Sequence, residues 1–472
     1  MMHDILVLGG GPAGMAAATL AAGRGARVAL VDEQPAPGGQ VYRAPAPGLD
    51  PPADADRREG DRLRAALAES GATVFPGHLV WDLGGGPLVA AGVPDAPFRI
   101  QALGDAPRTL TGRALILAGG TSERIIPFPG WTLPGVMGLA AATILLKAEA
   151  MLPGRAPLLA GAGPLLYAVA AKLIGAGVRP VAVVDLAGHG EWLAALPALA
   201  ARPDLLARGA AWRAMLMMAR VPVLAAHRLV AAEGTHGVTH ALVQPLAGGA
   251  VRRFAVDCIC VGHGLVPATE GSRAYRARHA FDAARGGWVA AADPSGRTSV
   301  AKLYVAGDGA GVRGAAAAPA SGRIAALAAL ADLGLGEDAA ALATATADQA
   351  RAARTGAAMA RMMALRPGLV AAIPPETIIC RCEGVTRAAI DAAVEAGARE
   401  VNQLKHFTRC FMGPCQGRLC GEAAAELVAS QVGGREAAGL PTGRVPLRPV
   451  PMAALLGDFA YADIPVPPPA PL

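Results

Sequence analysis

The chain has 472 residues, of which 53% are hydrophobic and 17% charged, and it contains 60 glycines. This composition excludes a disordered chain and indicates a globular, turn-rich α/β protein of about three domains. The formal net charge is +6. Because the densest basic clusters (Arg57-Arg58 and Arg252-Arg253) are short and aromatic residues make up only 4% of the chain, we expect no nucleic-acid site.

The N-terminus runs straight into an apolar stretch at residues 5–8, without a basic n-region or a cleavage site. Apolar runs such as residues 139–146 are shorter than the roughly 20 residues that a membrane span needs. We therefore expect no signal peptide, no transmembrane segment and a cytoplasmic location. Seven cysteines in such a chain indicate metal or redox chemistry before disulfides.

The first 31 residues predict a βαβ unit, with strands at 5–8 and 28–31 around a helix at 15–24. The turn Gly9-Gly10-Gly11-Pro12-Ala13-Gly14 fits G-x-G-x-x-G: Gly9 allows the tight turn, Gly11 lets the backbone approach a pyrophosphate, and Gly14 lets helix and strand pack closely. Asp32, with Glu33 beside it, follows the second strand, where an acid binds ribose hydroxyls. Together these features predict a dinucleotide site.

A second unit of the same kind follows a proline-rich loop, a helix near 60–70 and short strands over 73–115. Its strands are predicted at 157–160 and 181–184, and its helix at 165–174. Leu166 stands where the third glycine of the fingerprint belongs. We interpret this fold as a retained scaffold; if it does bind a nucleotide, Asp185 favours NAD over NADP.

The middle of the chain offers few reactive groups. Residues 188–220 predict a helical insertion, and strands resume at 221–224. Cys258 and Cys260 lie in an apolar strand, where cysteine is common as a small hydrophobe. No dithiol lies near either glycine-rich motif, which disfavours disulfide-reductase chemistry. His263 is a candidate base by its position alone; the alternative is an ordinary hydrogen-bonded turn histidine.

The last third begins with a strand at 303–308 that ends in Asp308, followed by a helix at 314–330 and one or two helices over 337–365. A Pro-rich tail from Leu440 is expected to run extended over the surface. The predicted divisions are the first part of the first dinucleotide-binding domain (1–125), a second, NAD-binding-like domain (126–295), a return segment of the first domain (296–335), a helical linker (336–375), a cysteine-rich module (376–432) and the tail (433–472).

Five cysteines lie between Cys380 and Cys420. Cys380-Arg381-Cys382 and the later pair Cys415 and Cys420 can bring four thiolates together, which suits tetrahedral zinc or an iron–sulfur cluster. The spacing alone leaves both metals open, although C-x-C is tight for zinc.

Three further segments resemble thioredoxin-reductase-like flavoproteins: Gly38-Gly39-Gln40, residues 115–120 (with Gly119 where threonine is usual) and residues 304–308. The resemblance implies two Rossmann-like dinucleotide-binding domains and one extended FAD. The residues it assigns to FAD, together with the first motif, are Gly9, Gly11, Pro12, Ala13, Gly14, Asp32, Glu33, Gly39, Gln40, Val80, Ala118, Gly119, Gly307 and Asp308.

The cysteine region, at residues 379–386 and 404–420, is similar to the bacterioferritin-associated-ferredoxin-like [2Fe-2S] module. This resemblance implies a small helical module with Cys380, Cys382, Cys415 and Cys420 as cluster ligands. Phe411 replaces an expected glycine, and Cys410 is a fifth thiol, either a neighbour of the cluster or a substitute ligand.

Residues 1–435 as a whole resemble the FAD-containing large subunits of heteromeric amine and amino-acid dehydrogenases, which act on opines, proline or D-hydroxyproline and include hydrogen-cyanide synthase. Matching patterns are Val80-Trp81, residues 126–131 and residues 402–405. The resemblance implies an FAD and [2Fe-2S] electron-transfer subunit beside a second, substrate-oxidising flavin subunit, which a small ferredoxin-like subunit can join. The alternatives are a self-contained NAD(P)H-dependent flavin reductase and a non-catalytic scaffold.

Overall fold

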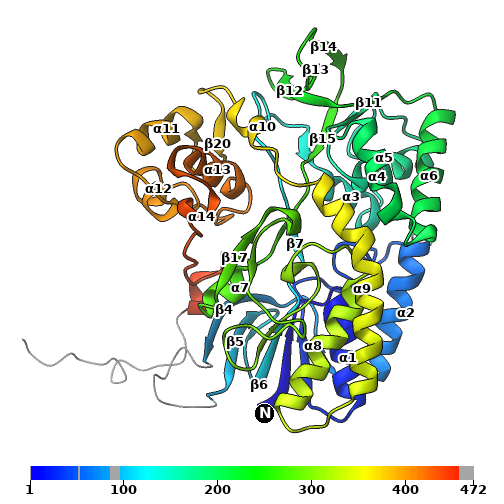
Figure 1. Cartoon of the computed structure of the whole chain (residues 1–472), viewed down its shortest axis with the longest axis vertical. Coiled ribbons are helices and arrows are strands. Elements are labelled where there is room, and N and C mark those ends of the chain that lie inside the picture. The colour runs from blue at the N-terminus through cyan, green and yellow to red at the C-terminus, as the bar shows by residue number, and fades with distance from the viewer. Residues whose placement is uncertain (1, 51–53, 86–95, 456–472) are drawn as a thin grey trace, which may run out of the picture.

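The computed structural model describes residues 2–50, 54–85 and 96–455. Its first sheet has seven strands in the order β3-β2-β1-β6-β5-β4, with β19 beside β6 (Figure 1). Strands β1, β2, β3 and β19 run parallel to their partners, whereas β4, β5 and β6 form an antiparallel meander. The strands are β1 (Met2–Leu8), β2 (Val28–Val31), β3 (Thr73–Phe75), β4 (Leu79–Gly85), β5 (Phe98–Leu103), β6 (Pro107–Leu117) and β19 (Leu303–Val305).

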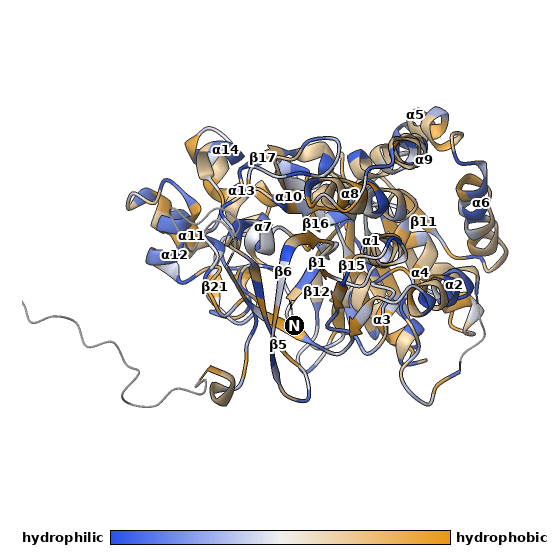
Figure 2. Ribbon diagram, turned by 90° about the horizontal axis from the view of Figure 1, so that it is seen from below, coloured by the Kyte–Doolittle hydropathy of each residue, from blue (hydrophilic) through white to orange (hydrophobic). Residues whose placement is uncertain are grey.

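Alternate residues of β1 face opposite sides of this sheet. Ile5 and Val7 pack with helices α1 (Pro12–Gly23) and α8 (Ala318–Asp332), while Leu6 lies in a second apolar layer on the other face. The two helices approach closely, because a Cβ on Gly322 of α8 would lie only 2.0 Å from the carbonyl oxygen of Ala13. Helix α2 (Ala55–Glu69), hydrophilic in Figure 2, lies beside α1.

The second sheet is parallel throughout, in the order β11-β10-β9-β15-β8. Its strands are β8 (Val136–Gly138), β9 (Pro157–Gly161), β10 (Ala182–Asp185), β11 (Val223–Ala225) and β15 (Cys258–Gly262). Its helices are α3 (Leu139–Ala148), α4 (Pro164–Gly175), α5 (His189–Leu199) and α6 (Pro203–Met218). An antiparallel meander extends from it, formed by β12 (His227–Glu233), β13 (His240–Pro245) and β14 (Arg252–Ala255).

Short paired strands and one long helix connect the two sheets. Strand β7 (Thr121–Glu123) pairs with β16 (Leu265–Pro267), and a hairpin of β17 (His279–Asp282) and β18 (Gly287–Ala290) lies nearby. The short helix α7 (Glu270–Ala274) follows β16. Helix α9 (Ala339–Met362) packs against both α8 and α5, so it contacts both nucleotide-type units.

The C-terminal module lies to one side of the first sheet, opposite α5 and α6 (Figures 1 and 2). It consists of β20 (Ile378–Cys380), β21 (Val385–Thr386), α11 (Arg387–Glu395), α12 (Val401–Thr408), α13 (Gly421–Val432) and α14 (Arg435–Ala438), preceded by α10 (Pro367–Ala371). Two nucleotide-type sheets and a small helical module confirm the predicted fold class.

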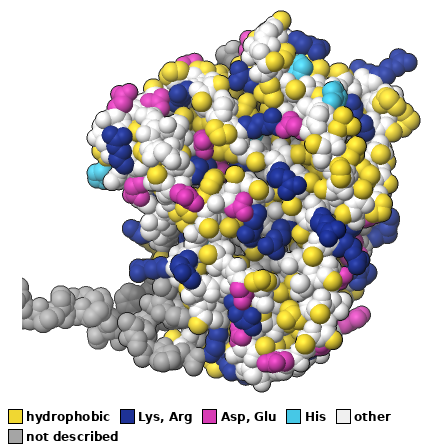
Figure 3. All heavy atoms as spheres, viewed as in Figure 1, with side chains coloured by type: hydrophobic (Ala, Val, Ile, Leu, Met, Phe, Trp, Pro, Cys, Tyr) yellow, Lys and Arg dark blue, Asp and Glu magenta, His cyan; other side chains and the backbone are white. Residues whose placement is uncertain are grey.

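Most predicted elements are present, with bounds shifted by a few residues. The 337–365 segment forms one helix, α9, and the tail from Leu440 runs without regular structure to a single 3-10 turn, Met452–Leu455. The rest of the predicted tail lies outside the described residues. None of the described helices combines the length and the apolar character that a bilayer crossing requires. Figure 3 shows Lys and Arg side chains dispersed over one face, with acidic and apolar side chains among them.

Candidate functional site

The glycine loop after β1 depends on two very close backbone contacts. Gly9 has a φ of +102°, and a Cβ there would lie 2.4 Å from the Ala118 carbonyl oxygen. A Cβ on Gly14 would lie 1.8 Å from the Gly9 carbonyl oxygen. Neither position has room for a side chain. The loop therefore brings β1, the end of β6 and the N-terminus of α1 together, and the free N–H groups of that terminus can receive a pyrophosphate.

Asp32, at the end of β2, is buried and faces this loop. Its carboxylate accepts the backbone N–H of Gly10 and, at 2.7 Å, that of Gln34. Burial raises the pKa of Asp32, and the two backbone hydrogen bonds oppose that shift. The neighbouring Glu33 is exposed, so of the two acids Asp32 is the one positioned beside the glycine loop, where ribose hydroxyls bind.

The Gly38-Gly39-Gln40 turn packs on the same loop. Gly39 has a φ of +59°, and a Cβ there would lie 3.0 Å from the Cα of Gly11. The exposed Gln40 accepts a 3.1 Å hydrogen bond from Arg43. The turn and the glycine loop therefore meet backbone to backbone, with no side chain between them at Gly11 and Gly39.

The return segment around Asp308 completes the site. A Cβ on Gly307 would lie 2.9 Å from the Cβ of Ala13, and one on Gly309 would lie 3.4 Å from the nitrogen of Gly120. Asp308 accepts the backbone N–H groups of Arg313 at 2.8 Å and Gly314 at 2.9 Å, both through Oδ1.

The structure thus brings together residues 9–14, 118–120 and 307–309, which are far apart in sequence. Pro12 opens helix α1, as its fixed φ favours, and Gly119 is exposed beside Ala268. Val80 is half-buried on β4, two strands beyond β6, and its described contacts do not place it against these loops.

The second nucleotide-type unit differs at the corresponding loop. A Cβ on Gly163 would lie 2.5 Å from both Cγ and Sδ of Met363, the residue that follows helix α9. Met363 therefore lies where a pyrophosphate would approach the backbone. Leu166 is fully buried among the apolar side chains between α4 and the sheet, so it fills the helix–sheet interface rather than the loop.

The acid of the second unit is also engaged. Asp185 Oδ2 accepts hydrogen bonds from the Tyr167 hydroxyl at 2.8 Å and from Trp192 Nε1 at 3.0 Å, and Oδ1 accepts the Ala187 N–H at 2.9 Å. Asp185 is completely buried. Two of the donors to Asp185 are therefore side chains of the same chain, whereas the hydrogen bonds described for Asp32 come from backbone N–H groups alone.

His263, the candidate base, is half-buried at the end of β15. Its Nδ1 accepts the Ile126 N–H at 3.1 Å. Burial, with Arg124 nearby, lowers the pKa of His263 to about 3, so the imidazole is a neutral acceptor at physiological pH. Its described hydrogen bonds, to the Ile126 N–H and from its own N–H to the Arg124 carbonyl, lie in the connection between the two sheets.

The five clustered cysteines form an inner and an outer group. The sulfurs of Cys380, Cys410 and Cys420 are buried and lie within 4.8 Å of one another. The thiols of Cys382, which is exposed, and Cys415, which is half-buried, contact each other. Contact with Cys410 and Cys420 lowers the pKa of Cys380, whereas contact with Cys380 and Cys420 raises that of Cys410. This concentration of thiols fits an iron–sulfur cluster.

The loop between Cys410 and Cys415 is tightly folded. Phe411, where a glycine was expected, has a φ of +70°, in the left-handed region that glycine favours. Its ring is buried, and a Cβ on Gly417 would lie 2.7 Å from it. A Cβ on Gly413 would lie 2.3 Å from the Cβ of Cys382. The glycines therefore let the loop close over both Phe411 and the first cysteine pair.

A buried ionic network that the sequence did not predict joins the module to the flavin core. Arg124, whose side chain is 2% exposed, pairs with Glu422 of α13 at 3.2 Å, and Glu422 pairs with Arg435 at 2.8 Å. Burial alone would raise the pKa of Glu422, but Arg435 and Arg124 hold it below its usual value. Arg124 also donates to the Met363 carbonyl at 2.8 Å, so the same residue holds the segment that covers Gly163.

Trp81 and Trp131, which belong to the patterns that match the family, lie where the C-terminal segments meet the flavin core. Trp131 donates to the Ile378 carbonyl at 2.6 Å, directly before the first cysteine pair. The Trp81 carbonyl accepts the Leu447 N–H at 2.7 Å. In the sequence, the two tryptophans stood out only as members of patterns that match the family. Those patterns do not indicate which residues the tryptophans contact.

We call residues 440–447 the C-terminal strap. Its Thr442 is held by Asn402 and Lys405 of α12, at 2.8 and 2.9 Å, and its Pro446 carbonyl accepts a hydrogen bond from Gln416 at 2.7 Å. Leu447 lies in the apolar layer of the first sheet. The strap therefore ties both α12 and the cysteine loop to the flavin domain.

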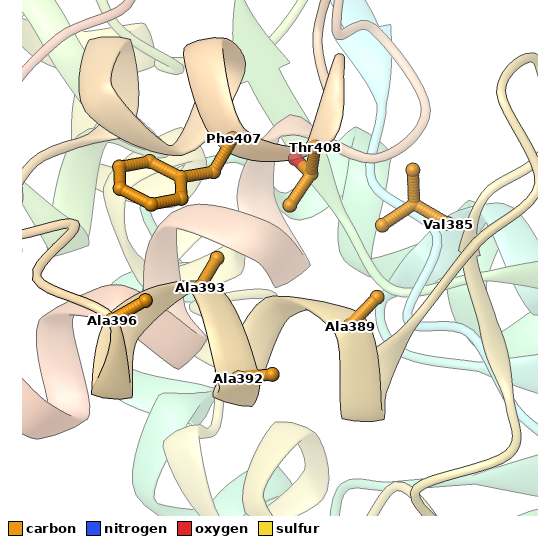
Figure 4. Close-up of a pocket in the computed structure, with 7 residues that line it drawn as sticks. All are labelled: Val385, Ala389, Ala392, Ala393, Ala396, Phe407 and Thr408. Carbon is orange, nitrogen blue, oxygen red and sulfur yellow. The ribbon is translucent and has the colours of Figure 1, made fainter.

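An apolar groove of about 400 Å³ lies between α11 and α12 on the module (Figure 4). Its lining comprises Val385, Ala389, Ala392, Ala393, Ala396, Phe407 and Thr408. The one hydroxyl, on Thr408, already donates to the Leu404 carbonyl at 2.7 Å. The groove therefore offers no reactive group.

Comparison with known proteins agrees with both cofactor sites. Residues 3–325 match the pyridine nucleotide-disulphide oxidoreductase family, and residues 378–430 match the BFD-like [2Fe-2S] binding domain. The chain is 37% identical to an opine oxidase subunit of Agrobacterium tumefaciens (strain Ach5), over 96% of this chain and 91% of that protein. It is 32% identical to hydrogen cyanide synthase subunit HcnB of Pseudomonas protegens, over 96% and 97% of the two chains.

Solved structures show the same fold. An L-proline dehydrogenase from P. horikoshii superposes with a TM-score of 0.72 at 19% identity, covering 97% of this chain and 80% of that one. A thioredoxin reductase from T. acidophilum superposes with a TM-score of 0.52 at 19% identity, covering 70% and 98%. FAD and a [2Fe-2S] cluster are thus the cofactors of this flavin oxidoreductase. The chain belongs to the pyridine nucleotide-disulphide oxidoreductase family and, within it, to the group that contains this opine oxidase subunit.

Proposed function

We propose that this chain is the electron-transfer subunit of a heteromeric dehydrogenase or oxidase that acts on the C–N bond of an amino acid, an imino acid such as proline or hydroxyproline, or an opine. Its relatives are subunits by name. In this proposal a second flavin-containing subunit oxidises the substrate, and a small ferredoxin-like subunit can complete the assembly. FAD takes up two electrons together and a [2Fe-2S] cluster takes up one, so the pair converts between the two modes of transfer.

One observation carries the proposal: a Cβ added at Gly11, the second glycine of the first loop, would meet no described side chain within 4 Å, whereas the corresponding glycine of the second unit is covered by its own chain. Met363 lies against Gly163, and Asp185 is bonded to Tyr167 and Trp192. This arrangement supports a flavin that receives electrons from a partner protein rather than from NAD(P)H.

The residues proposed to hold FAD are those of the three converging segments. Gly9, Gly11 and Gly14 admit the pyrophosphate to the helix N-terminus. The full proposed set is Gly9, Gly11, Pro12, Ala13, Gly14, Asp32, Glu33, Gly39, Gln40, Val80, Ala118, Gly119, Gly307 and Asp308. The positions of Glu33, exposed, and Val80, on β4, make these two the weakest members of that set.

The junction residues are proposed to fix the cluster module relative to the flavin. Arg124 and Arg435 share Glu422, and Arg418 pairs with Glu270 at 2.9 Å. Because electron transfer depends on a fixed, short separation, a module held by buried ion pairs and the strap suits a relay better than a mobile carrier does.

Anaerobic mixing tests the direction of electron supply. We expect the purified protein to keep its flavin absorption when NADH or NADPH is added. The flavin should bleach when the co-purifying partner protein and an oxidisable amine are both present. A panel of an opine, proline, D-hydroxyproline, glycine and sarcosine then identifies the substrate class. Rapid bleaching by either nucleotide alone would instead establish a self-contained reductase, and a protein that binds neither cofactor would establish a scaffold.

The cluster ligands are proposed to be Cys380, Cys382, Cys415 and Cys420. Replacing Cys415 by serine should abolish the iron–sulfur absorption and leave the FAD content unchanged. Replacing Cys258 by serine is the matched control, because that thiol is buried in β15 of the second sheet. Unchanged iron in the Cys415→Ser protein would contradict this ligand set.

A further inference from the structure

Arg43 places a positive charge beside the flavin loops. Its side chain is half-buried, and its two terminal nitrogens donate to the amide oxygens of Gln34 and, at 3.1 Å, Gln40. Its Nε is enclosed and has no hydrogen-bond partner among the described residues. Within the described part of the chain Arg43 forms no ion pair, so the groups that its guanidinium contacts there are neutral.

The two partners of Arg43 each lie one step from the glycine loop. The Gln34 N–H donates to Asp32 at 2.7 Å, and Asp32 in turn accepts a backbone N–H of the loop. Gln40 ends the turn that meets Gly11 backbone to backbone. Arg43 therefore spans the space between the acid positioned for a ribose and the glycine at which a pyrophosphate approaches the backbone.

The charges of the flavin site are otherwise unbalanced. Of the residues assigned to FAD, Asp32, Glu33 and Asp308 are acids and none is a cation, although the pyrophosphate is itself an anion. The N-terminus of α1 offers only partial positive charge. Burial lowers the pKa of Arg43, and the nearby Asp32 and Glu33 oppose that shift. Because arginine stays protonated in proteins, Arg43 supplies a full positive charge next to these acids.

The segment that carries Arg43 is held from both nucleotide-type units. Lys147 of α3, in the second unit, donates to the Val41 carbonyl at 2.7 Å. Arg64 of α2, in the first unit, donates to the Tyr42 carbonyl at 2.9 Å. Both bonds go to the backbone next to Arg43, so its side chain can be replaced while the segment remains held in place.

We propose that Arg43 binds the pyrophosphate of FAD through its guanidinium and supplies the positive charge that the other assigned residues lack. A guanidinium presents several N–H donors in one plane, a geometry that matches the oxygens of a phosphate group. The inference rests on the proposed FAD-binding set, to which it adds one residue.

The test uses the full chain purified with its own FAD. Release of FAD is followed as the rise in flavin fluorescence after dilution into buffers of increasing KCl concentration, and the flavin midpoint potential is measured for each protein. Arg43→Ala removes the charge and Arg43→Lys keeps it. Arg43→Gln, which is also neutral, takes the place of Arg43→Ala if that variant is isolated without flavin. Arg62→Ala is the matched control, because this exposed arginine of α2 pairs with Glu59 at 2.7 Å.

We expect Arg43→Ala to release FAD about tenfold faster than the wild-type protein at low salt, as for the loss of one hydrogen bond to a charged group. Added KCl should accelerate release from the wild-type protein more than from Arg43→Ala, because salt screens the attraction between the guanidinium and the phosphates. Arg43→Lys should have an intermediate rate, since it keeps the charge without the planar donors. Arg62→Ala should match the wild-type protein, and the flavin midpoint should be constant throughout.

Equal release rates from Arg43→Ala and the wild-type protein would overturn the inference. Faster release with an unchanged dependence on KCl would also overturn it, because Arg43 would then be only a structural link between Gln34 and Gln40. A shifted flavin midpoint would place Arg43 at the isoalloxazine ring instead of the pyrophosphate. If the wild-type protein carried no FAD, the cofactor assignment itself would fail, and that result is distinguishable because it precedes any variant.

Discussion

The two nucleotide-type units share one plan and differ in how much of it remains exposed. In the first, Gly14 allows α1 to rest on the loop, and Asp32 is held by the backbone N–H groups of Gly10 and Gln34. In the second, Leu166 fills the helix–sheet interface, Met363 covers Gly163, and Asp185 is surrounded by donors of the same chain. The comparison teaches that a dinucleotide fold can keep its architecture while its polar groups become part of the core.

The largest expected effect comes from adding one methyl group to the first unit. A Cβ at position 14 would lie 1.8 Å from the Gly9 carbonyl oxygen, so Gly14→Ala must move α1 away from the loop. We expect the purified variant to lose most of its flavin, measured as absorbance per protein after gel filtration. Gly23→Ala in the same helix is the control, because nothing lies within 4 Å of an added Cβ there; equal flavin in both variants would contradict the packing described for the loop.

Removing the side chain that replaces the third glycine should have a purely structural effect. Leu166 is 0% exposed, and such a leucine-to-alanine change costs about 2–5 kcal/mol of unfolding free energy. We expect Leu166→Ala to lower the urea midpoint while flavin per folded protein stays constant. If the variant instead gained NADH-dependent flavin bleaching, Leu166 would be a barrier to nucleotide rather than part of the core.

A pH dependence of stability should arise where β7, in the connection between the two units, meets the start of α3. Glu123 accepts the Ala140 N–H at the start of α3, and burial raises its pKa to about 8. The folded protein therefore keeps a proton that the unfolded chain releases above about pH 4.5. This contribution to stability is present at low pH and is lost as the pH rises towards 8.

Glu123→Gln keeps the shape and an acceptor oxygen but cannot titrate. The difference between its urea midpoints at pH 5.5 and 7.5 should therefore be smaller than that of the wild-type protein. The same difference in both proteins would mean that Glu123 is ionised in the folded state.

The smallest expected effect concerns one hydrogen bond to Asp185. Tyr167→Phe removes the hydroxyl donor, while Trp192 and the Ala187 N–H remain. We expect a loss of about 1 kcal/mol of unfolding free energy, with flavin content unaffected. A loss of flavin on this change would show that the two units are coupled more closely than their separate sheets suggest.

Local patterns sufficed to predict what a single turn or helix end requires. The glycine loop after β1 was expected from its spacing, and the left-handed φ of Phe411 occurs where a glycine had been expected. Leu166 in place of a glycine led us to interpret the second unit as a retained scaffold. The residue that covers its loop, however, is Met363, which lies far later in the chain. No local spacing rule connects Gly163 to the end of α9.

The junction shows the same limit. Trp131, Trp81 and Lys405 stood out in the sequence as members of matching patterns, but each contacts a distant segment: the start of β20, Leu447 and Thr442. Similarly, the spacing predicted that Cys380, Cys382, Cys415 and Cys420 would surround one metal centre. In the fold, Cys410 lies beside Cys380 and Cys420, and Cys382 contacts Cys415. Contacts of this kind depend on tertiary packing and not on neighbouring residues.

The strap has a consequence for how the chain is made. Leu447 lies in the same apolar layer as Leu6 of β1, so a segment late in the chain completes a layer to which β1 contributes. A chain that stops before residue 440 would leave that layer open, with apolar side chains exposed to chaperones and proteases. Closure of this layer of the flavin domain thus requires the strap to have been synthesised.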